Sequence, residues 1–170
     1  MAMMELSRGN SESRIKSERM SAVWGQKQAE ARRSGRMITS RLPAWLEERD
    51  GKIVVVPDRV QIVENMFAWC LNGLGLSLIV KRLTESGIPN FGRGSHWSKA
   101  YVHKTLTSRV VLGEYQPLRD GKPAGPPILN YYPAILSEDT WQLVQAALKR
   151  RKDKPGPVGK NIATLFGGLL

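Results

Sequence analysis

The chain has 170 residues, with 26 Lys and Arg against 15 Asp and Glu, which gives a formal net charge of +11. This length suits one domain or slightly more, and the positive charge favours a polyanionic partner. The sequence has neither an apolar run of membrane-spanning length nor the apolar core of a signal peptide, so a membrane protein is excluded and a cytoplasmic location is expected.

The first 41 residues are predicted to form a polar helix and a linker that precede the main domain. Residues 1–9 are expected to be disordered, whereas residues 10–34 are rich in strong helix formers and contain few apolar side chains. A helix this polar is expected to project from the domain rather than pack wholly into a core. The linker at residues 35–41 carries Arg36 and Arg41, which suit either a narrow minor groove or an ordinary solvated loop.

A small β-hairpin is predicted next. Residues 42–46 and residues 52–56 flank a turn at residues 47–51, and the second arm is rich in β-branched side chains. Trp45, in the first arm, is expected to lie in the core.

Residues 57–107 show the pattern of three short helices, with a tight turn between the first two. Asp58 and Ser77 are the expected N-caps of the first and second helices, and residues 72–75 and 86–89 contain the Gly, Asn and Pro that end helices. The expected inward residues of these two helices are Val60, Val63, Phe67, Cys70, Leu71, Ile79, Val80 and Leu83. This is the layout of a helix-turn-helix DNA reader.

The third helix is predicted to start at Ser98, to end near Thr107 and to contact DNA. Val102, Thr105 and Leu106 fall on its inner side, while no acidic residue occurs between Glu85 and Glu114. Its lysines suit either a solvated surface or a major groove, and the acid-free window favours the groove. The candidate base-reading and flanking residues are Ser98, Lys99, Ala100, Tyr101, His103, Lys104 and Thr107. Arg93 and Arg109, in the loops at either end, are the candidate phosphate contacts.

The last part of the domain is predicted to be a wing followed by a helix. Residues 110–115 and 128–132 read as paired strands around an exposed loop, whose Arg119 and Lys122 either touch a phosphate or keep the loop soluble. Ser137 is the expected cap of the final helix, with Trp141, Val144 and Leu148 facing inward. Its basic end, residues 149–152, either complements the helix dipole or binds a phosphate backbone.

Neither a catalytic site, a metal site nor a cofactor is predicted. The single cysteine, Cys70, cannot form an internal disulfide and is expected to be a buried hydrophobic residue. His96 and His103 have no Cys or carboxylate cluster near them in sequence. The glycine pair Gly92 and Gly94 is too short a motif to indicate nucleotide binding.

The order of these motifs resembles the recombinase domain of large serine recombinases, which are phage integrases and long transposon resolvases. The resemblance covers about residues 11–170, with departures at Ser108, where Asn is common, and Val111, where an aromatic residue is common. The matching residues are Arg36, Pro43, Trp45, Leu46, Pro57, Leu74, Gly75, Ile79, Leu83, Gly87, Ile88, Pro89, Trp97, Ser98, Val102, Leu106, Leu112, Gly113, Glu114, Tyr115, Tyr132, Pro133, Ala134, Ile135 and Trp141.

The resemblance implies a bacterial or phage-encoded protein in which a catalytic domain carries a serine nucleophile and ends in a long helix like residues 11–34. It also implies a zinc ribbon introduced by an apolar segment like residues 161–170. The sequence has neither a resolvase-type serine motif upstream nor a CxxC motif downstream. The chain is therefore expected to be a monomeric fragment without activity of its own. The parent enzyme would cut and rejoin two DNA sites through a phosphoserine link.

We therefore expect an α+β fold, mainly α, with a helix-turn-helix or winged-helix-like domain, small β-hairpins and a long projecting helix. The expected boundaries are residues 1–41 for the helix and linker, 42–153 for the DNA-binding domain and 154–170 for a linker and the start of a further region. The expected function is recognition of a recombination half-site in duplex DNA. A freestanding winged-helix transcription regulator and a basic RNA-associated domain are the alternatives.

Overall fold

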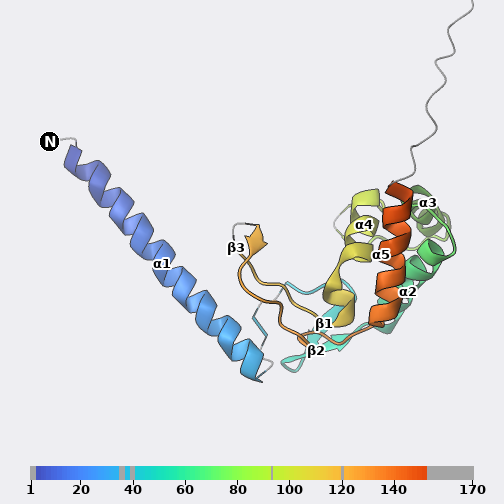
Figure 1. Cartoon of the computed structure of the whole chain (residues 1–170), viewed down its shortest axis with the longest axis horizontal. Helices are drawn as coiled ribbons and strands as arrows, with labels where there is room; N and C mark the ends of the chain where they lie inside the picture. The colour runs from blue at the N-terminus through green and yellow to red at the C-terminus, as the bar shows by residue number, and fades with distance from the viewer. Residues whose placement is uncertain (1–2, 35–36, 39–40, 93, 120, 153–170) are drawn as a thin grey trace, which may run out of the picture.

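A computed structural model describes residues 3–34, 37–38, 41–92, 94–119 and 121–152 of the chain. Four helices and two small antiparallel hairpins form a domain from which the long first helix projects (Figure 1). The predicted class, α+β and mainly α with a projecting helix, is confirmed. Among the described residues, no helix is long and apolar enough to cross a membrane.

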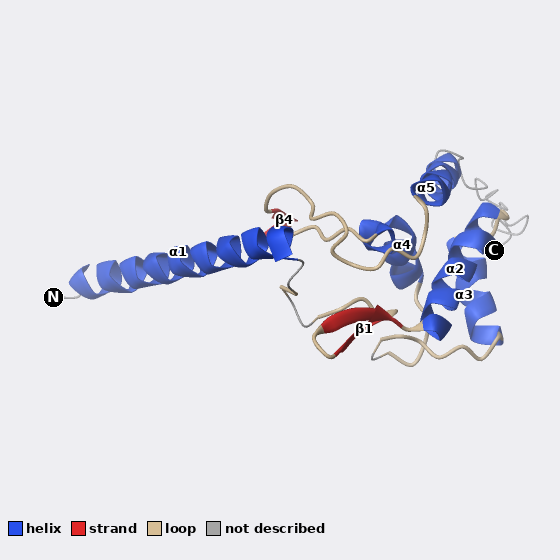
Figure 2. Cartoon of the chain, turned by 90° about the horizontal axis from the view of Figure 1, so that it is seen from below, coloured by secondary structure: helices blue, strands red, loops and turns tan. Residues whose placement is uncertain are grey.

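The projecting helix is α1 (Met3–Ser34), and only its C-terminal half lies beside the rest of the chain (Figure 2). Its sparse apolar side chains are largely exposed, as their spacing predicts, with Trp24 40% and Met20 53% accessible. The expected disorder of residues 1–9 is wrong for residues 3–9, which continue the helix. Gly9 costs only about 1 kcal/mol inside a helix, and strong helix formers precede it, so the helix does not stop there.

The first hairpin pairs β1 (Leu46–Arg49) with β2 (Lys52–Val55) in antiparallel register. The turn is shorter than the predicted residues 47–51, because Asp50 and Gly51 alone make it, with φ of +52° and +74°. Two consecutive left-handed residues twist the chain in the sense that a two-residue hairpin requires. Trp45 is buried beside this hairpin, as predicted.

The helical core consists of α2 (Pro57–Leu71), α3 (Leu76–Glu85), α4 (Lys99–Thr107) and α5 (Glu138–Lys152), with α2 packed against the other three. The three-helix order with a tight first turn is confirmed. Asn72 ends α2, and Gly73 turns the chain with a φ of +93°. The core side chains with essentially no exposure are Val63, Met66, Phe67, Cys70, Ile79, Leu83, Val102, Leu106, Val111 and Val144.

Two predicted caps and one predicted core residue are wrong. Helix α2 has Val56 as its N-cap, without a side-chain cap, so Asp58 lies in the first turn instead. Pro57 begins the helix, and its missing N–H removes one of the donors that a cap would satisfy. Likewise Gly75 precedes α3, and Ser77 lies inside it. Leu71 is 41% exposed. The buried face of α2 ends at Cys70, and Leu71 lies one residue beyond it, turned toward solvent.

The predicted strand at residues 110–115 is also wrong. The chain instead forms the 3-10 helix η1 (Arg109–Leu112) and then turns at Gly113, whose φ is +87°. The Gly113 carbonyl accepts hydrogen bonds from the backbone N–H groups of Tyr131 (2.8 Å) and Tyr132 (3.0 Å). Of the predicted strand pair, only the bridge between Tyr115 and Ile128 forms.

The wing between these segments contains β3 (Leu118–Arg119) and β4 (Lys122–Pro123), a minimal antiparallel pair. It lies beside α1 in both ribbon views (Figures 1 and 2). After the wing, Ser137 caps α5 as predicted, because its Oγ accepts a hydrogen bond from the backbone N–H of Thr140 at 3.3 Å.

Candidate nucleic-acid interface

The start of α4 is held by a side-chain cap and by an aromatic cluster. Ser98 has extended φ and ψ angles, and its Oγ accepts a hydrogen bond from the backbone N–H of Tyr101 at 3.1 Å. Trp97 is buried and donates its indole N–H to the carbonyl of Ile88 at 2.8 Å. Its ring contacts Phe91 and Tyr101 edge-on, at centroid distances of 4.9 and 5.6 Å. The direction of α4 is therefore fixed at its first turn.

The loop before α4 is organised by Asn90, a residue without a sequence signal of its own. Its side-chain amide donates to the carbonyls of Gly94 (3.1 Å) and His96 (3.0 Å), and its oxygen accepts from the N–H of Gly92 at 3.1 Å. These bonds tie the loop into a compact turn. Arg93, the predicted phosphate contact in this loop, lies outside the described residues, so its role stays a prediction.

Helix α4 has the two faces that its sequence predicts. Val102, Thr105 and Leu106 are buried in the core. On the other side Lys99, Ala100, His103 and Lys104 are exposed, while Thr107 is half-buried and donates to the carbonyl of His103 at 2.8 Å. The outer face is short, polar and positive, which are the properties that a helix needs to enter a major groove.

Tyr101 contributes to the cluster as much as to the surface. Its ring is half-buried against Phe91 and Trp97. Burial raises the pKa of Tyr101, against the opposing effects of the Arg59 charge and a hydrogen bond with Thr105. The phenol is therefore neutral at physiological pH, and its remaining exposed part borders the outer face of α4.

Arg109, the other predicted phosphate contact, is engaged within the domain. Its guanidinium binds both oxygens of Glu114 (2.7 and 2.6 Å) and of Glu138 (3.2 and 3.0 Å), and it lies over the Trp141 ring. The hydrogen bonds that Arg109 donates to Glu114, and then those to Glu138, raise the pKa of Arg109. The hydrogen bond from Arg109 is the main cause that lowers the pKa of Glu138. A phosphate would compete with two carboxylates here, so contact with Arg109 stays a prediction.

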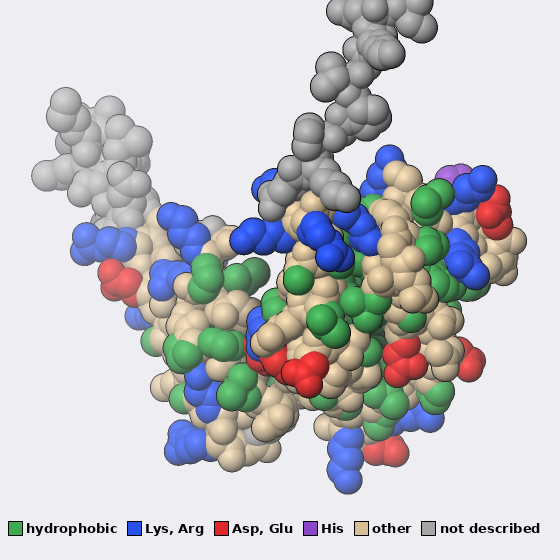
Figure 3. Space-filling model, turned by 45° about the vertical axis from the view of Figure 1, so that its right-hand side comes forward, with side chains coloured by type: hydrophobic (Ala, Val, Ile, Leu, Met, Phe, Trp, Pro, Cys, Tyr) green, Lys and Arg blue, Asp and Glu red, His purple; other side chains and the backbone are tan. Residues whose placement is uncertain are grey.

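A shallow groove separates α4 from the C-terminal half of α5, with the start of α3 at its edge. Its lining side chains are Leu76, Ser77, Lys99, His103, Thr107, Gln145, Leu148, Lys149, Arg151 and Lys152. In Figure 3, Lys and Arg side chains gather along the upper edge of the domain, and most of the Asp and Glu side chains in view lie below them. The groove thus brings together cations from two elements that are about 50 residues apart along the chain.

The family model described as Recombinase matches residues 57–151. The chain belongs to the Recombinase family. The predicted resemblance to the recombinase domain of large serine recombinases is therefore confirmed.

The chain is also similar to individual proteins in sequence or in fold. The uncharacterized protein YbcK of Escherichia coli (strain K12) is 32% identical over 148 residues, which are 85% of this chain and 29% of that protein. The fold is similar to a crystal structure of an LSR–DNA complex, with a TM-score of 0.60, 15% identity and coverage of 76% and 38% of the two chains. It is also similar to a structure concerned with the sequence requirements of the Listeria innocua prophage attP site, with a TM-score of 0.56, 15% identity and coverage of 75% and 52%. The chain thus spans about a third to a half of the proteins that it matches.

The linker before this Recombinase domain is partly described. Ile38 is buried, and its N–H donates to the hydroxyl of Tyr131 at 2.6 Å, so the linker is anchored to the segment after the wing. Arg41 is exposed at the edge of the domain. Arg36 lies outside the described residues, and minor-groove contact by either arginine stays a prediction.

The pairing of Arg151 with the end of α2 has no sequence signal, because its partner is 81 residues away. Arg151 donates to the carbonyl of Cys70 at 2.8 Å and contacts its sulfur at 3.2 Å. Cys70 is buried, as predicted. In the part of the chain that the structure describes, no three His, Cys, Asp or Glu side chains gather as metal ligands.

Proposed function

We propose that this Recombinase domain recognises a recombination half-site in duplex DNA, with the outer face of α4 in the major groove. The observation that carries the proposal is the exposed, acid-free face of a helix whose first turn is fixed by Ser98 and Trp97. Membership of the Recombinase family and the likeness in fold to a chain solved with DNA support it. The cutting and rejoining of DNA would be carried out by a longer protein, in which this domain positions the DNA.

The roles of individual residues follow from their exposure. Lys104 and His103 are the side chains that we assign to base edges, because they lie on the exposed middle turn of α4. Lys99, Ala100 and Thr107 lie beside them on the side of α4 that would face the DNA major groove. A base-specific contact discriminates by about 1–3 kcal/mol, whereas a phosphate contact weakens binding to every sequence about equally.

The test measures affinity for the specific half-site and for unrelated duplex DNA. His103→Ala and Lys104→Ala should weaken binding to the specific site by about 1–3 kcal/mol and binding to unrelated DNA much less. Lys52→Ala, at the opposite hairpin, is the matched control and should change neither. If both α4 variants kept full specific affinity while Arg119→Ala or Lys122→Ala abolished it, the wing would be the reading element and the proposal would be wrong.

A further inference from the structure

The groove between α4 and α5 has basic side chains on its α5 wall, which the reading face of α4 does not explain. Lys99 and His103 line one wall of the groove, and Lys149 and Lys152 line the other. The described residues that line it include no Asp or Glu. An uncompensated positive groove of this kind suits a chain of phosphates.

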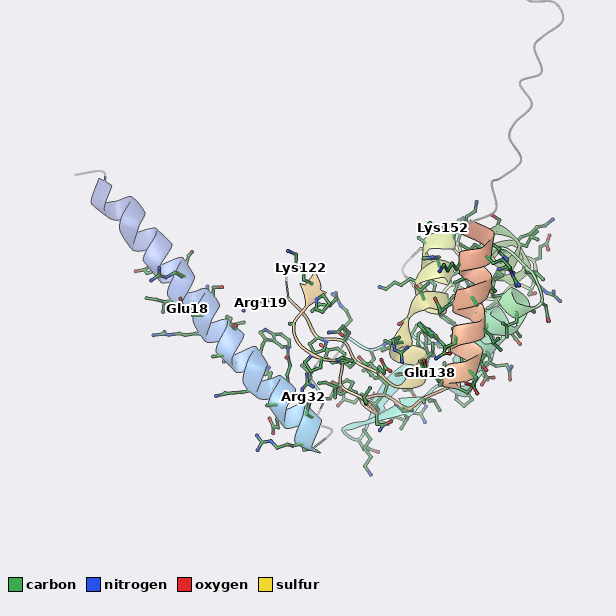
Figure 4. All side chains as sticks on the ribbon, viewed as in Figure 1. Glu18, Arg32, Arg119, Lys122, Glu138 and Lys152 are labelled. Atoms are coloured by element: carbon green, nitrogen blue, oxygen red, sulfur yellow. The ribbon has the colours of Figure 1, made fainter. Side chains whose placement is uncertain are left out.

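The two helices run antiparallel, which brings the basic end of α5 to the start of α4. The Gln145 side-chain amide donates to the carbonyl of Leu106 at 2.7 Å, and this bond places the middle of α5 beside the last turn of α4. The following turns of α5 then pass along α4 toward Lys99. In Figure 4, Lys152 lies at this end of α5 and Glu138 lies at the opposite end.

Arg151 holds the last turn of α5 in place. Helix ends fray when nothing fixes them, but the Arg151 guanidinium binds the Cys70 carbonyl and sulfur at the end of α2. The Cys70 carbonyl also accepts a hydrogen bond from the backbone N–H of Gly73 at 3.2 Å, so Arg151 is a second donor at the C-terminus of α2. Lys149 and Lys152 are three residues apart, so they share one face of the anchored turn.

The helix dipole alone does not account for this arrangement. A cation anywhere around the last turn of α5 would complement the dipole, and Arg150 does so without lining the groove. Lys149 and Lys152 line the groove beside α4, whereas Arg150, on the same last turn, does not. The comparison of these three residues therefore separates the dipole from a binding role.

We propose that this groove binds a phosphodiester strand of the same duplex that α4 reads, with Lys149 and Lys152 as phosphate contacts and Arg151 as a positioning residue. The inference rests on the proposed function, since it gives that DNA a second point of attachment. The DNA strand would pass between the basic end of α5 and the first turns of α4. This contact would fix how deeply α4 enters the major groove of the DNA.

The first experiment measures DNA affinity of the full chain across a range of salt concentrations. The double variant Lys149→Ala/Lys152→Ala should reduce the log–log salt slope by about 2, because each phosphate contact contributes about 0.9. It should weaken specific and unrelated DNA alike. Arg150→Ala is the matched control and should leave the slope almost unchanged, and circular dichroism should show the same melting temperature for all three proteins.

The second experiment tests Arg151 by a double-mutant cycle. Arg151→Ala should weaken DNA binding in the wild-type background and have little further effect when Lys149 and Lys152 are already Ala, because it acts through them. A merely structural role would lower the melting temperature and weaken binding equally in both backgrounds, which would overturn the positioning role.

The two proposals fail in different ways. If the Lys149/Lys152 variant behaved like Arg150→Ala while His103→Ala and Lys104→Ala still lost specific affinity, the groove inference would be wrong and the proposed function would stand. If the wild-type chain bound no duplex DNA at low salt, both would be wrong.

Discussion

At the scale of single residues, Gly113 decides how the chain leaves η1 after α4. Its φ is +87°, and a Cβ built on it would lie 2.6 Å from the carbonyl oxygen of Tyr132. The carbonyl oxygen of Gly113 accepts hydrogen bonds from the backbone N–H groups of Tyr131 and Tyr132. Gly73, after α2, has a similar φ of +93°, but a Cβ there would meet nothing within 4 Å.

These two glycines give a matched stability prediction. Ala at either position must adopt a left-handed backbone, which costs about 1–2 kcal/mol. Gly113→Ala should lower the free energy of unfolding by clearly more than Gly73→Ala, because the Tyr132 backbone has to move as well. Urea unfolding of both variants measures the difference. Equal losses would mean that the Gly113 turn relaxes without cost.

The ion pair between Arg109 and Glu138 is the second residue-scale feature with a measurable consequence. The hydrogen bond from Arg109, followed by one from Gln142, lowers the pKa of Glu138 in the folded chain. A carboxyl group with a lowered folded pKa stabilises the fold above its unfolded pKa of about 4.3, and this contribution is lost as the pH falls through the folded pKa.

Glu138→Gln should therefore lower the melting temperature at pH 7 and have progressively less effect as the pH falls below about 4. Asp139→Asn is the control, since it removes the same charge at the same end of α5 without removing a partner of Arg109. Thermal melts at a series of pH values from 7 downward measure this effect. The melting temperatures of Glu138→Gln and the wild type should converge as the pH falls. A constant difference at every pH would contradict the assigned role of the pair.

At the scale of elements, α1 and the wing form a contact that the sequence does not predict. One face of α1 presents the small residues Ser17, Ser21 and Gly25 at intervals of four, and the wing lies against it. Arg119 donates to the Ser21 hydroxyl at 2.6 Å, and Arg32 donates to the carbonyl of Pro126 at 2.7 Å. In Figure 4 both arginines lie where α1 and the wing meet. The wing thus sets the direction in which α1 projects.

Removing this contact should loosen α1 without unfolding the domain. In Arg119→Ala, the amides of residues 17–28 should exchange with deuterium faster, while those of α2 should be unchanged, because the hydrogen bond that joins the wing to Ser21 of α1 is lost. Arg14→Ala is the control, since Arg14 pairs with Glu18 on the surface of α1 itself. Unchanged exchange in residues 17–28 would show that the wing does not restrain α1.

At the scale of the whole molecule, the net charge of +11 bears on the proposed binding of DNA. We expect a monomer in the absence of DNA, whose affinity for duplex DNA falls with salt at a log–log slope on the order of −4 to −8, as several phosphate contacts require. Fluorescence anisotropy at several salt concentrations measures the slope, and sedimentation measures the mass. A slope near zero would exclude DNA as the main partner, and dimers at micromolar concentration would contradict the monomer.

The sequence by itself determined the elements whose stability is local. The spacing of Val102, Thr105 and Leu106 defined the inner face of α4, and Ser98 defined its start, because helix periodicity and capping depend on residues only a few positions apart. The projecting character of α1 followed in the same way from its few apolar residues. The motif order from Arg36 to Trp141 was enough to indicate the family.

The tertiary structure alone decided what depends on residues far apart in the chain. Residues 110–115 have the β-branched pattern of a strand, but burial of Val111 and the Gly113 turn impose a 3-10 helix, since packing outweighs β propensity. In the sequence, Arg109 is a candidate phosphate contact in a loop. In the folded chain it pairs with Glu138, which is 29 residues away. The α4–α5 groove likewise exists only because Gln145 and Arg151 find partners 39 and 81 residues away, and such contacts leave no mark in local sequence.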